Sequence, residues 1–344
     1  MTSEQVLRHA AVIYNPTRIQ LERVTRIVDA AATAAGWGDT VWIPTREHSA
    51  AIEQVAEALD AGASLVIAAG GDGTVREVAG AMRRTGTPFA VVPVGTANLF
   101  ARNAGIPIET TAAVRAAFSG EDRSIDVGVI EYRRPEGEQQ STPFLVMTGF
   151  GVDADMVAYA DPVLKRRLGW VAYVGPIIRG LVRRDRPRVS WKEDGGPVRS
   201  GRTHSMFIGN CGTVSAGLEI LPDALLDDGV LDVLMVRSLE GWDGVRLTRW
   251  LHRANNPVAR LKKARGMRAS RTSLSAVDTA ADAGGALRYL RVERIDLRVS
   301  PDAEFQADGD AIGAVAAARV TIDAGSLLVR LPVTTPRSAR LGPL

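Results

Sequence analysis

The sequence predicts an α/β N-terminal domain with a parallel sheet, followed by a mostly antiparallel β domain. Three observations predict this arrangement. Short apolar runs alternate with amphipathic segments in the first third of the chain, the alternation stops near residue 127, and β-like runs with few helical periods follow. At 344 residues the chain is long enough for two domains that each bury a core.

The elements of the first domain follow from these periods. Strands are expected at residues 10–14, 41–43, 65–69 and 89–92, where apolar residues run without interruption. Apolar residues recur at helical spacing in residues 21–35, 52–59 and 75–82. Each of these helices should therefore bury one face against the sheet.

The second domain is expected to be built from short strands. The β-like runs are residues 124–130, 144–148, 189–192, 206–209, 231–236, 295–299 and 320–323. Asp194-Gly195-Gly196 is typical of a hairpin turn, and residues 132–142 read as a polar loop. We place the domains at 1–127 and 128–332, with a flexible tail at 333–344.

Composition narrows the function classes. A net charge of +3 argues against a nucleic-acid binder that works by phosphate neutralisation. The single cysteine, Cys211, cannot form an internal disulfide and fits a reducing cytoplasm. The N-terminus lacks the pattern of a signal peptide and no run approaches the ~18 apolar residues of a membrane span. Any membrane is therefore expected to be met from outside.

A glycine-rich loop is the first candidate site. Gly70-Gly71-Asp72-Gly73-Thr74 follows an apolar strand and precedes a helix, so backbone N–H groups and a helix N-terminus can meet an anion there. Thr74 is expected to cap the helix or contact a phosphate, and Asp72 to orient a magnesium-bound phosphate. Taken alone, the loop fits a plain strand-to-helix turn equally well.

A second loop, Pro93-Val94-Gly95-Thr96-Ala97-Asn98, follows the next strand in the same way. Both loops should emerge at the carboxyl edge of the parallel sheet, where ligands bind. Thr17 and Thr45 also follow strands, and for these two helix capping is the better interpretation. The patterns GxxxxGK[ST] and GxGxxG are absent from the sequence.

These motifs resemble the catalytic-domain family of diacylglycerol kinases, specifically the bacterial lipid kinases. The resemblance extends over most of residues 10–312, through Ser124-Ile125-Asp126-Val127-Gly128, residues 149–154, 209–210 and 222–229, to Gln306-Ala307-Asp308-Gly309-Asp310. It implies that the second domain is a β-sandwich. It also implies that ATP is the phosphoryl donor and that Mg²⁺ is required.

The resemblance carries over to particular residues. It implies nucleotide binding by Asn15, Thr17, Thr45, Gly70, Gly71, Asp72, Gly73, Thr74, Glu77, Gly95, Thr96 and Asn98. Asp308 is implied as the general base, assisted by Asp310, although the spacing alone favours a solvated turn. A structural magnesium is implied at Leu225, Asp228 and Val230.

One departure concerns the first loop. Many relatives continue Asn-Pro into a small glycine-containing loop, whereas Asn15-Pro16-Thr17 runs here into Arg18. The bulky residue either tightens the turn or contacts phosphate itself.

The resulting prediction is an ATP-dependent lipid kinase that converts diacylglycerol to phosphatidate. Sphingoid or ceramide kinases remain alternatives, as do NAD kinases, although the chain has no Asn-Glu dipeptide of the kind NAD kinases usually carry. A nucleotide-sensing, membrane-binding module is the non-enzymatic alternative.

The expected partners are ATP and a lipid at a membrane surface, with a homodimer left open and no nucleic acid. We expect a cytoplasmic protein in peripheral contact with the inner face of the membrane. Basic segments at residues 177–188 and 242–263 are the candidates for that contact, although amphipathic packing explains each of them as well.

Overall fold

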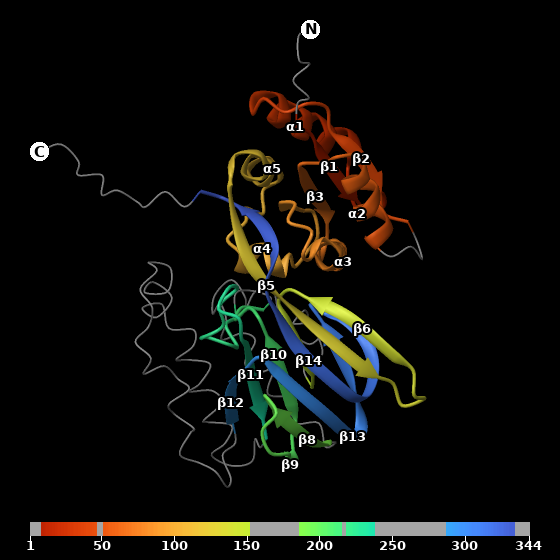
Figure 1. The fold of residues 1–344 in the computed structure, drawn as a ribbon, viewed down its shortest axis with the longest axis vertical. Helices are drawn as coiled ribbons and strands as arrows, with labels where there is room; N and C mark the ends of the chain where they lie inside the picture. The colour runs from red at the N-terminus through yellow and green to blue at the C-terminus, as the bar shows by residue number, and fades with distance from the viewer. Residues whose placement is uncertain (1–7, 47–50, 152–185, 215–217, 238–286, 334–344) are drawn as a thin grey trace, which may run out of the picture. The chain divides into compact units, whose positions relative to one another are not determined.

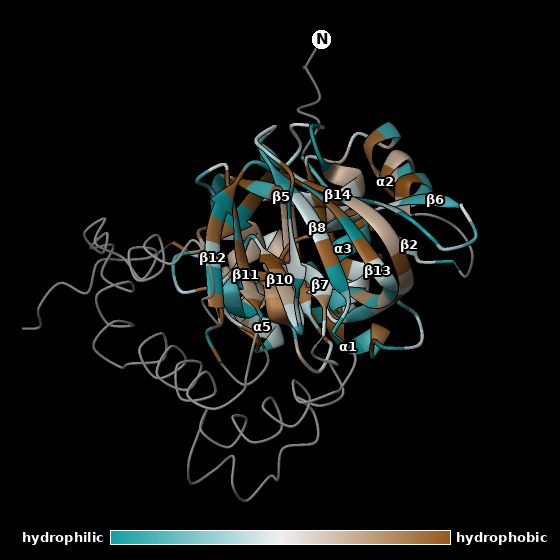
Figure 2. Cartoon of the chain, turned by 90° about the horizontal axis from the view of Figure 1, so that it is seen from below, coloured by the Kyte–Doolittle hydropathy of each residue, from teal (hydrophilic) through white to brown (hydrophobic). Residues whose placement is uncertain are grey.

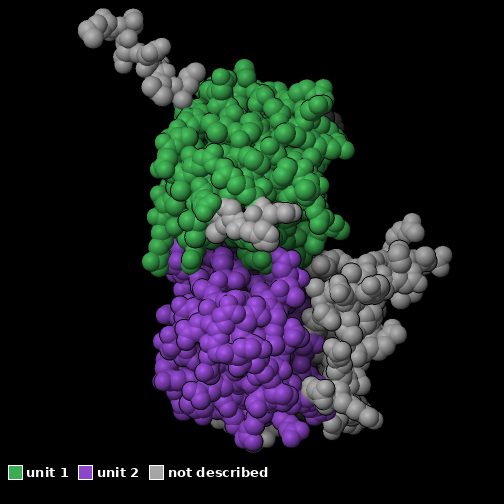
Figure 3. Space-filling model, turned by 90° about the vertical axis from the view of Figure 1, so that its right-hand side faces the viewer, with its two compact units in different colours: residues 1–125, 327–344 green, residues 126–326 purple. Residues whose placement is uncertain are grey.

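A computed structural model describes residues 8–46, 51–151, 186–214, 218–237 and 287–333. These residues form two compact units, 1–125 with 327–344 and 126–326, coloured separately in Figure 3. Most of the predicted basic segment 177–188, all of segment 242–263 and nearly all of the predicted tail lie outside the described residues.

The first unit is built on the predicted parallel strands (Figure 1). They are β1 (Ala10–Tyr14), β2 (Val41–Pro44), β3 (Leu65–Gly70) and β4 (Phe89–Pro93), in the order β2-β1-β3-β4. The helices are α1 (Leu21–Ala34), α2 (Ala51–Asp60), α3 (Asp72–Met82), α4 (Leu99–Asn103) and α5 (Thr110–Ser119). The structure confirms all four strands and the three long helices expected from periodicity.

Burial explains why the first unit adopts this form. All residues of β1, β3 and β4 are buried, as expected for parallel strands covered by helices. Helix α1 turns Val24, Val28 and Ala32 inward, and these pack with strand residues and with Phe118 of α5. The apolar residues that recur at helical spacing in α1 are therefore the ones that form its buried face.

The second unit is mostly antiparallel. Its strands are β5 (Glu121–Arg133), β6 (Gln139–Phe144), β7 (Met147–Phe150), β8 (Arg188–Glu193), β9 (Arg199–Arg202), β10 (Ser205–Gly209), β11 (Leu231–Val236), β12 (Leu287–Val292), β13 (Arg294–Ala307) and β14 (Asp310–Leu331). The path β12-β11-β10-β7-β13-β14 carries the hairpins β8-β9 and β5-β6 as side pairs. Hydrophobic and hydrophilic residues alternate visibly along β13 (Figure 2), and the hydrophobic ones enter one core.

The sequence predicted a hairpin turn at residues 194–196 and a polar loop at residues 132–142 in the second unit. The predicted turn at Asp194 joins β8 to β9, and Asp194 adopts a positive φ of 42° there. The predicted loop at 132–142 is instead mostly a hairpin, in which Arg133 pairs with Gln139 and Tyr132 donates to Gln140. Its polar residues are solvent-facing strand residues, which is why the segment read as a loop.

The unit boundary also differs from the expected one. It falls between residues 125 and 126 rather than after 127, within β5, and residues 327–331 belong to the first unit instead of the second domain. The reason for the second difference is that β14 continues beyond the antiparallel unit and pairs in parallel with β4, Val329 facing Phe89. The first unit therefore contains an additional strand from the C-terminal part of the chain.

Candidate active site

The two predicted polar loops lie side by side in the first unit. Strands β3 and β4 pair in parallel along their length, with Gly70 opposite Pro93, so the loops that follow them leave the same edge of the sheet. The Val94 N–H donates to the Gly70 carbonyl at 3.0 Å. The expected convergence of these two loops is confirmed.

Two glycines set how closely the loops approach. A Cβ on Gly95 would lie 2.7 Å from the Gly71 Cα atom, so a side chain at position 95 would push the loops apart. A Cβ on Gly70 would lie 2.4 Å from the Thr74 Cβ atom. Close packing, against the Gly71 backbone at Gly95 and against the Thr74 side chain at Gly70, therefore favours glycine at these positions rather than positive φ.

The Asp72 carboxylate joins the loops. Its oxygens accept hydrogen bonds from the Asn98 N–H at 2.9 Å and the Leu99 N–H at 2.5 Å. Asn98 adopts a left-handed conformation with φ of 48°, and its side chain bonds both the N–H and the carbonyl of Gly95. Asp72 thus connects the glycine-rich loop to the start of α4, a role that the sequence did not indicate.

The N-terminus of α3 opens directly from the glycine-rich loop. The helix begins at Asp72 with Gly71 as its N-cap residue, so Thr74 lies in the first turn and does not cap the helix. Because an N-cap glycine has no side chain, it leaves the first-turn N–H groups to other acceptors, which suits an anion. Two further predicted residues, Glu77 in α3 and Thr96 in the loop after β4, are exposed to solvent.

The loop after β1 is a closed turn. The Asn15 Oδ1 atom accepts from the Thr17 N–H at 3.0 Å and from its hydroxyl at 2.8 Å. Helix α1 starts only at Leu21 with Gln20 at its N-cap, so capping does not explain Thr17. Thr45 donates its N–H to the Tyr14 carbonyl at 2.8 Å and so extends the pairing of β1 with β2.

Asp308 lies in the second unit, in the turn between β13 and β14, with a positive φ of 51°. It is 5% exposed, and its carboxylate accepts hydrogen bonds from the N–H groups of Leu145, Val146 and Met147 at 2.8–2.9 Å. These amides take three of the roughly four lone-pair sites of a carboxylate, so they fix the orientation of the side chain. The neighbouring Asp310 is exposed.

Asp126 holds the predicted metal loop in the second unit. It is 2% exposed, and its two oxygens accept from the N–H groups of Gly229 and Gly325, each at 2.7 Å. Its own N–H donates to the Leu226 carbonyl. Sequence reasoning did not select this residue as a site, although it stands in one of the motifs that carried the family resemblance.

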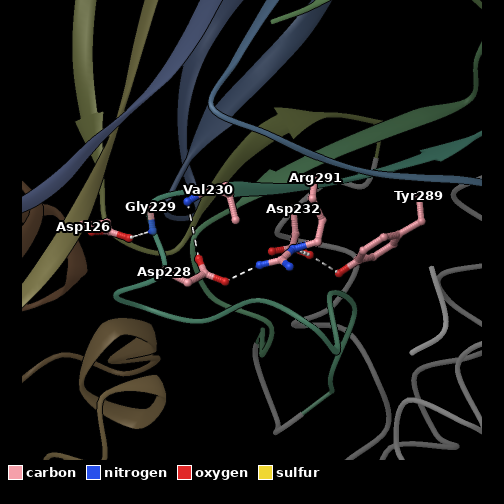
Figure 4. Close-up of polar contacts among 7 residues, drawn as sticks. All are labelled: Asp126, Asp228, Gly229, Val230, Asp232, Tyr289 and Arg291. Carbon is pink, nitrogen blue, oxygen red and sulfur yellow. Dashed lines mark hydrogen bonds and ion pairs between the residues drawn. The ribbon is translucent and has the colours of Figure 1, made fainter. Parts of the chain in front are cut away.

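A charged cluster lies beside this loop (Figure 4). It is formed by Asp228 of the loop, Asp232 of β11, and Tyr289 and Arg291 of β12. The Arg291 guanidinium forms ion pairs with Asp228 and, at 3.6 Å, with Asp232. Asp232 is fully buried and accepts the Tyr289 hydroxyl at 2.6 Å. Burial raises the pKa of Asp232 to about 7, and burial also raises the pKa of Asp228. Sequence spacing gave no sign of Asp232, Tyr289 or Arg291.

The predicted magnesium residues can be tested against this cluster. Asp232 Oδ2 is buried and receives no hydrogen bond from any described residue, and Asp126 and Asp227 both add to the negative potential at Asp228. Carboxylate oxygens are ligands that suit a hard cation. Among the described residues no group of three or more acidic, histidine or cysteine side chains gathers as a metal site, and Arg291 already neutralises part of the charge. A cation at Asp228 would therefore compete with Arg291.

These features define a class: a parallel α/β unit with two joined loops at the carboxyl edge of its sheet, followed in the chain by an antiparallel β unit. The family model described as "diacylglycerol kinase catalytic domain" matches residues 9–130. A second family model, described as "YegS C-terminal NAD kinase beta sandwich-like domain", matches residues 146–286. The chain belongs to the diacylglycerol kinase catalytic-domain family, among the YegS-like lipid kinases. The expected β-sandwich is thereby confirmed.

Individual relatives agree with this assignment. A "probable lipid kinase YegS-like" protein of Pseudomonas fluorescens is 34% identical over 76% of this chain and 86% of its own length. A protein of the same description from Pseudomonas putida is 34% identical over 68% and 77%. A solved structure described as a diacylglycerol kinase of Bacillus anthracis has a TM-score of 0.64 at 18% identity, covering 95% of this chain and 98% of that one. It shows the fold.

Membrane insertion was not expected from the sequence. Among the residues that the structure describes, no helix combines the length and the apolar character needed to cross a bilayer.

Proposed function

We propose that the chain transfers the γ-phosphoryl group of ATP to the hydroxyl group of a lipid, with diacylglycerol as the acceptor and phosphatidate as the product. The observation that carries the proposal is the pair of loops after β3 and β4, joined by Asp72 at the N-terminus of α3. An edge of this kind suits a polyphosphate, and family membership makes that polyphosphate ATP.

In this proposal the first unit binds the nucleotide. The N–H groups of the glycine-rich loop and of the first turn of α3 bind phosphate oxygens. Mg²⁺ bound together with the nucleotide would supply charge neutralisation. Gly95 and Asn98 keep the second loop close enough to contribute. The closed turn at Asn15 and Thr17 contributes through its shape, because Thr17 already directs its N–H and hydroxyl to Asn15.

The turn at Asp308 and Asp310 is proposed to serve the acceptor. The lipid hydroxyl oxygen forms a bond to the γ-phosphorus, the bond from that phosphorus to the β–γ bridging oxygen breaks, and ADP leaves with the bonding electrons. A carboxylate takes the hydroxyl proton. Asp308 is the proposed base, and the three amides that it binds orient it, while the exposed Asp310 assists.

The same proposal includes a structural Mg²⁺ held by Asp228 with carbonyl groups of Leu225 and Val230. Its support is the negative potential that Asp126 and Asp227 add at Asp228, together with the buried Asp232 Oδ2, to which no described residue donates a hydrogen bond. When bound, the cation would supply charge neutralisation to the loop that Asp126 anchors.

The decisive experiment is a phosphoryl-transfer assay with labelled ATP and Mg²⁺. The acceptors are diacylglycerol, a sphingoid base and ceramide, each in detergent micelles, and NAD in solution. Label in phosphatidate is the expected result. Label confined to a sphingolipid overturns diacylglycerol as the acceptor, label in NAD alone overturns the lipid kinase, and transfer to none of them leaves a nucleotide-binding module instead.

Asp308→Asn tests the base, but it also disturbs folding. An amide side chain must turn its NH₂ group toward a backbone N–H of residues 145–147, so we expect a loss of about 1.5–3 kcal/mol in stability. Asp310→Asn, at an exposed position, should change stability by less than about 0.5 kcal/mol while lowering turnover. Rates are therefore compared per folded molecule, with the folded fraction taken from thermal unfolding. A folded Asp308→Asn variant with wild-type kcat contradicts its role as base.

A further inference from the structure

A groove lies between α1 and α5 of the first unit, two helices that pack against each other. It measures about 810 Å³ and is separate from the loops that follow β3 and β4. Its floor is apolar, formed by Ile27 and small alanines of α1 together with Phe118 of α5. Ala30 and Ala34 are exposed along it. Because these side chains are short, a partner can approach the helix backbone closely.

Three arginines border this floor: Arg23 and Arg26 from α1 and Arg115 from α5. All three are exposed, and no carboxylate lines the groove. Among the residues that the structure describes, none of the three forms an ion pair, although Arg115 acts electrostatically on Glu109 at the start of α5. Arg26 only donates its Nε–H to the backbone carbonyl of Glu22. Like charges three residues apart on a helix weaken it slightly, so the stability of α1 gives no reason for placing Arg23 and Arg26 together.

The geometry points to the groove between α1 and α5 as the surface by which the chain docks on an anionic phospholipid bilayer. The guanidinium groups of Arg23, Arg26 and Arg115 would bind headgroup phosphates, because arginine pairs with phosphate in bidentate fashion. Ile27 and the exposed alanines would face the apolar boundary beneath the headgroups. This inference rests on the proposed lipid kinase in one respect only, the choice of phospholipid headgroups as the anionic partner.

Other occupants fit less well. A second copy bound symmetrically would bring three arginines against the same three, which like-charge repulsion opposes. Nucleic acid would meet the arginines but leave the apolar floor without a contact, since duplex grooves and phosphates are polar. An acidic protein segment would satisfy the arginines, and the experiment separates it from a bilayer.

The test is co-flotation of the full chain with vesicles of phosphatidylcholine alone and of phosphatidylcholine mixed with phosphatidylglycerol. Each guanidinium near an anionic surface contributes about fivefold in partitioning, so a variant with Arg23, Arg26 and Arg115 all replaced by Gln should lose on the order of a hundredfold on the anionic vesicles. Replacing the exposed Arg133, Arg202 and Arg298 by Gln removes the same charge elsewhere and should cost far less.

The apolar floor is tested independently. Ile27→Glu should weaken binding to the anionic vesicles by at least tenfold, whereas Ile52→Glu, at a residue that is 67% exposed on α2, should weaken it much less. Equal losses in the two triple variants, or wild-type binding by Ile27→Glu, overturn the assignment of this groove. If the wild-type chain binds soluble polyglutamate more tightly than it binds the anionic vesicles, the assignment to a bilayer is overturned in favour of an acidic protein.

Failure of this inference can be told from failure of the proposed kinase. Phosphoryl transfer to diacylglycerol in uncharged detergent micelles needs no anionic surface, so the triple variant should retain wild-type kcat there. A wild-type chain that binds anionic vesicles through the groove yet transfers phosphate to no acceptor overturns the kinase alone.

Discussion

At the scale of single residues, Asp72 shows how one side chain can determine the shape of a site. Its two oxygens bind two N–H groups of the following loop, 26 and 27 residues away in the sequence. A metal-orienting role was the prediction from the sequence, and it stays a prediction. The hydrogen bonds also show that Asp72 connects the loop after β3 to the loop after β4. Replacing Asp72 would therefore alter the site even when no nucleotide is bound.

Gly95→Ala tests this loop spacing. The new Cβ atom would lie 2.7 Å from Gly71 Cα and 2.9 Å from Asn98 Oδ1, so the loops must separate. Overpacking of this kind costs about 1–3 kcal/mol, and we expect nucleotide affinity to fall by about tenfold to a hundredfold in calorimetric titration. Gly105→Ala is the control, because it also loses stability through its positive φ but meets open space. Equal nucleotide affinity in both variants would contradict the role assigned to Gly95.

Arg291→Met tests competition between a guanidinium and a cation at Asp228. Without metal the variant should be less stable by about 1–3 kcal/mol, because two carboxylates lose their shared partner. Thermal unfolding with Mg²⁺ should then raise Tm more in the variant than in wild type, since Asp228 is released for the cation. Arg294→Met, which breaks an exposed pair with Asp296, serves as the control. An identical magnesium response in Arg291→Met and wild type argues against a cation at Asp228.

At the scale of elements, α5 is defined at its start by Glu109, whose carboxylate accepts the N–H groups of Thr111 and Ala112. By contrast, the N-cap residues of α1, α3 and α4, which are Gln20, Gly71 and Asn98, make no side-chain capping hydrogen bond. This difference makes the stability of α5 depend on one ionised side chain, and the helix carries one side of the arginine-bordered groove.

Glu109 should therefore give α5 a pH-dependent contribution. The hydrogen bond from the Thr111 N–H, and then that from Ala112, lower the pKa of Glu109 below its ordinary 4.5. A lowered pKa in the folded state means that the stabilisation is complete above about pH 4.5 and is lost as pH falls through the folded value. Glu109→Ala should show a reduced Tm at neutral pH, with the difference from wild type shrinking in acid. The control is Glu22→Ala, in the first turn of α1 but not at its cap, whose Tm difference from wild type should be small at every pH. A Tm difference between Glu109→Ala and wild type that stays constant across pH would refute the interpretation.

The elements also show what the sequence could predict. Strands β1, β3 and β4 were predictable because each is buried along its whole length, and α1 because Val24, Val28 and Ala32 repeat with the helix. The paired loops were predictable because parallel strands end at one edge. The Asp228 cluster was not, because Asp126 meets Gly229 across 103 residues and Arg291 meets Asp228 across 63. Such contacts depend on strand register, which local patterns do not contain.

At the scale of the whole molecule, β14 gives the two units a common strand. Its earlier part pairs with β13 in the second unit, and its last residues pair with β4 in the first. No local signal could have shown this, since Val329 joins Phe89 from the opposite end of the chain. The consequence is that the first unit is not encoded by residues 1–125 alone.

Truncation of the chain should reveal this dependence. Leu327 and Val329 are fully buried in the first unit, and Arg330 pairs with Asp122 at 2.7 Å and lies over the Trp37 ring. Burying two such apolar side chains contributes about 3–6 kcal/mol, a large part of the 5–15 kcal/mol that holds a typical domain folded. A chain ending at Ser326 should therefore lose cooperative unfolding of the first unit and nucleotide binding with it, whereas a chain ending at Val333 keeps both. Thermal unfolding and nucleotide titration of the two truncated chains decide the matter, because wild-type behaviour of the shorter one would mean that β4 needs no partner from the C-terminal part of the chain.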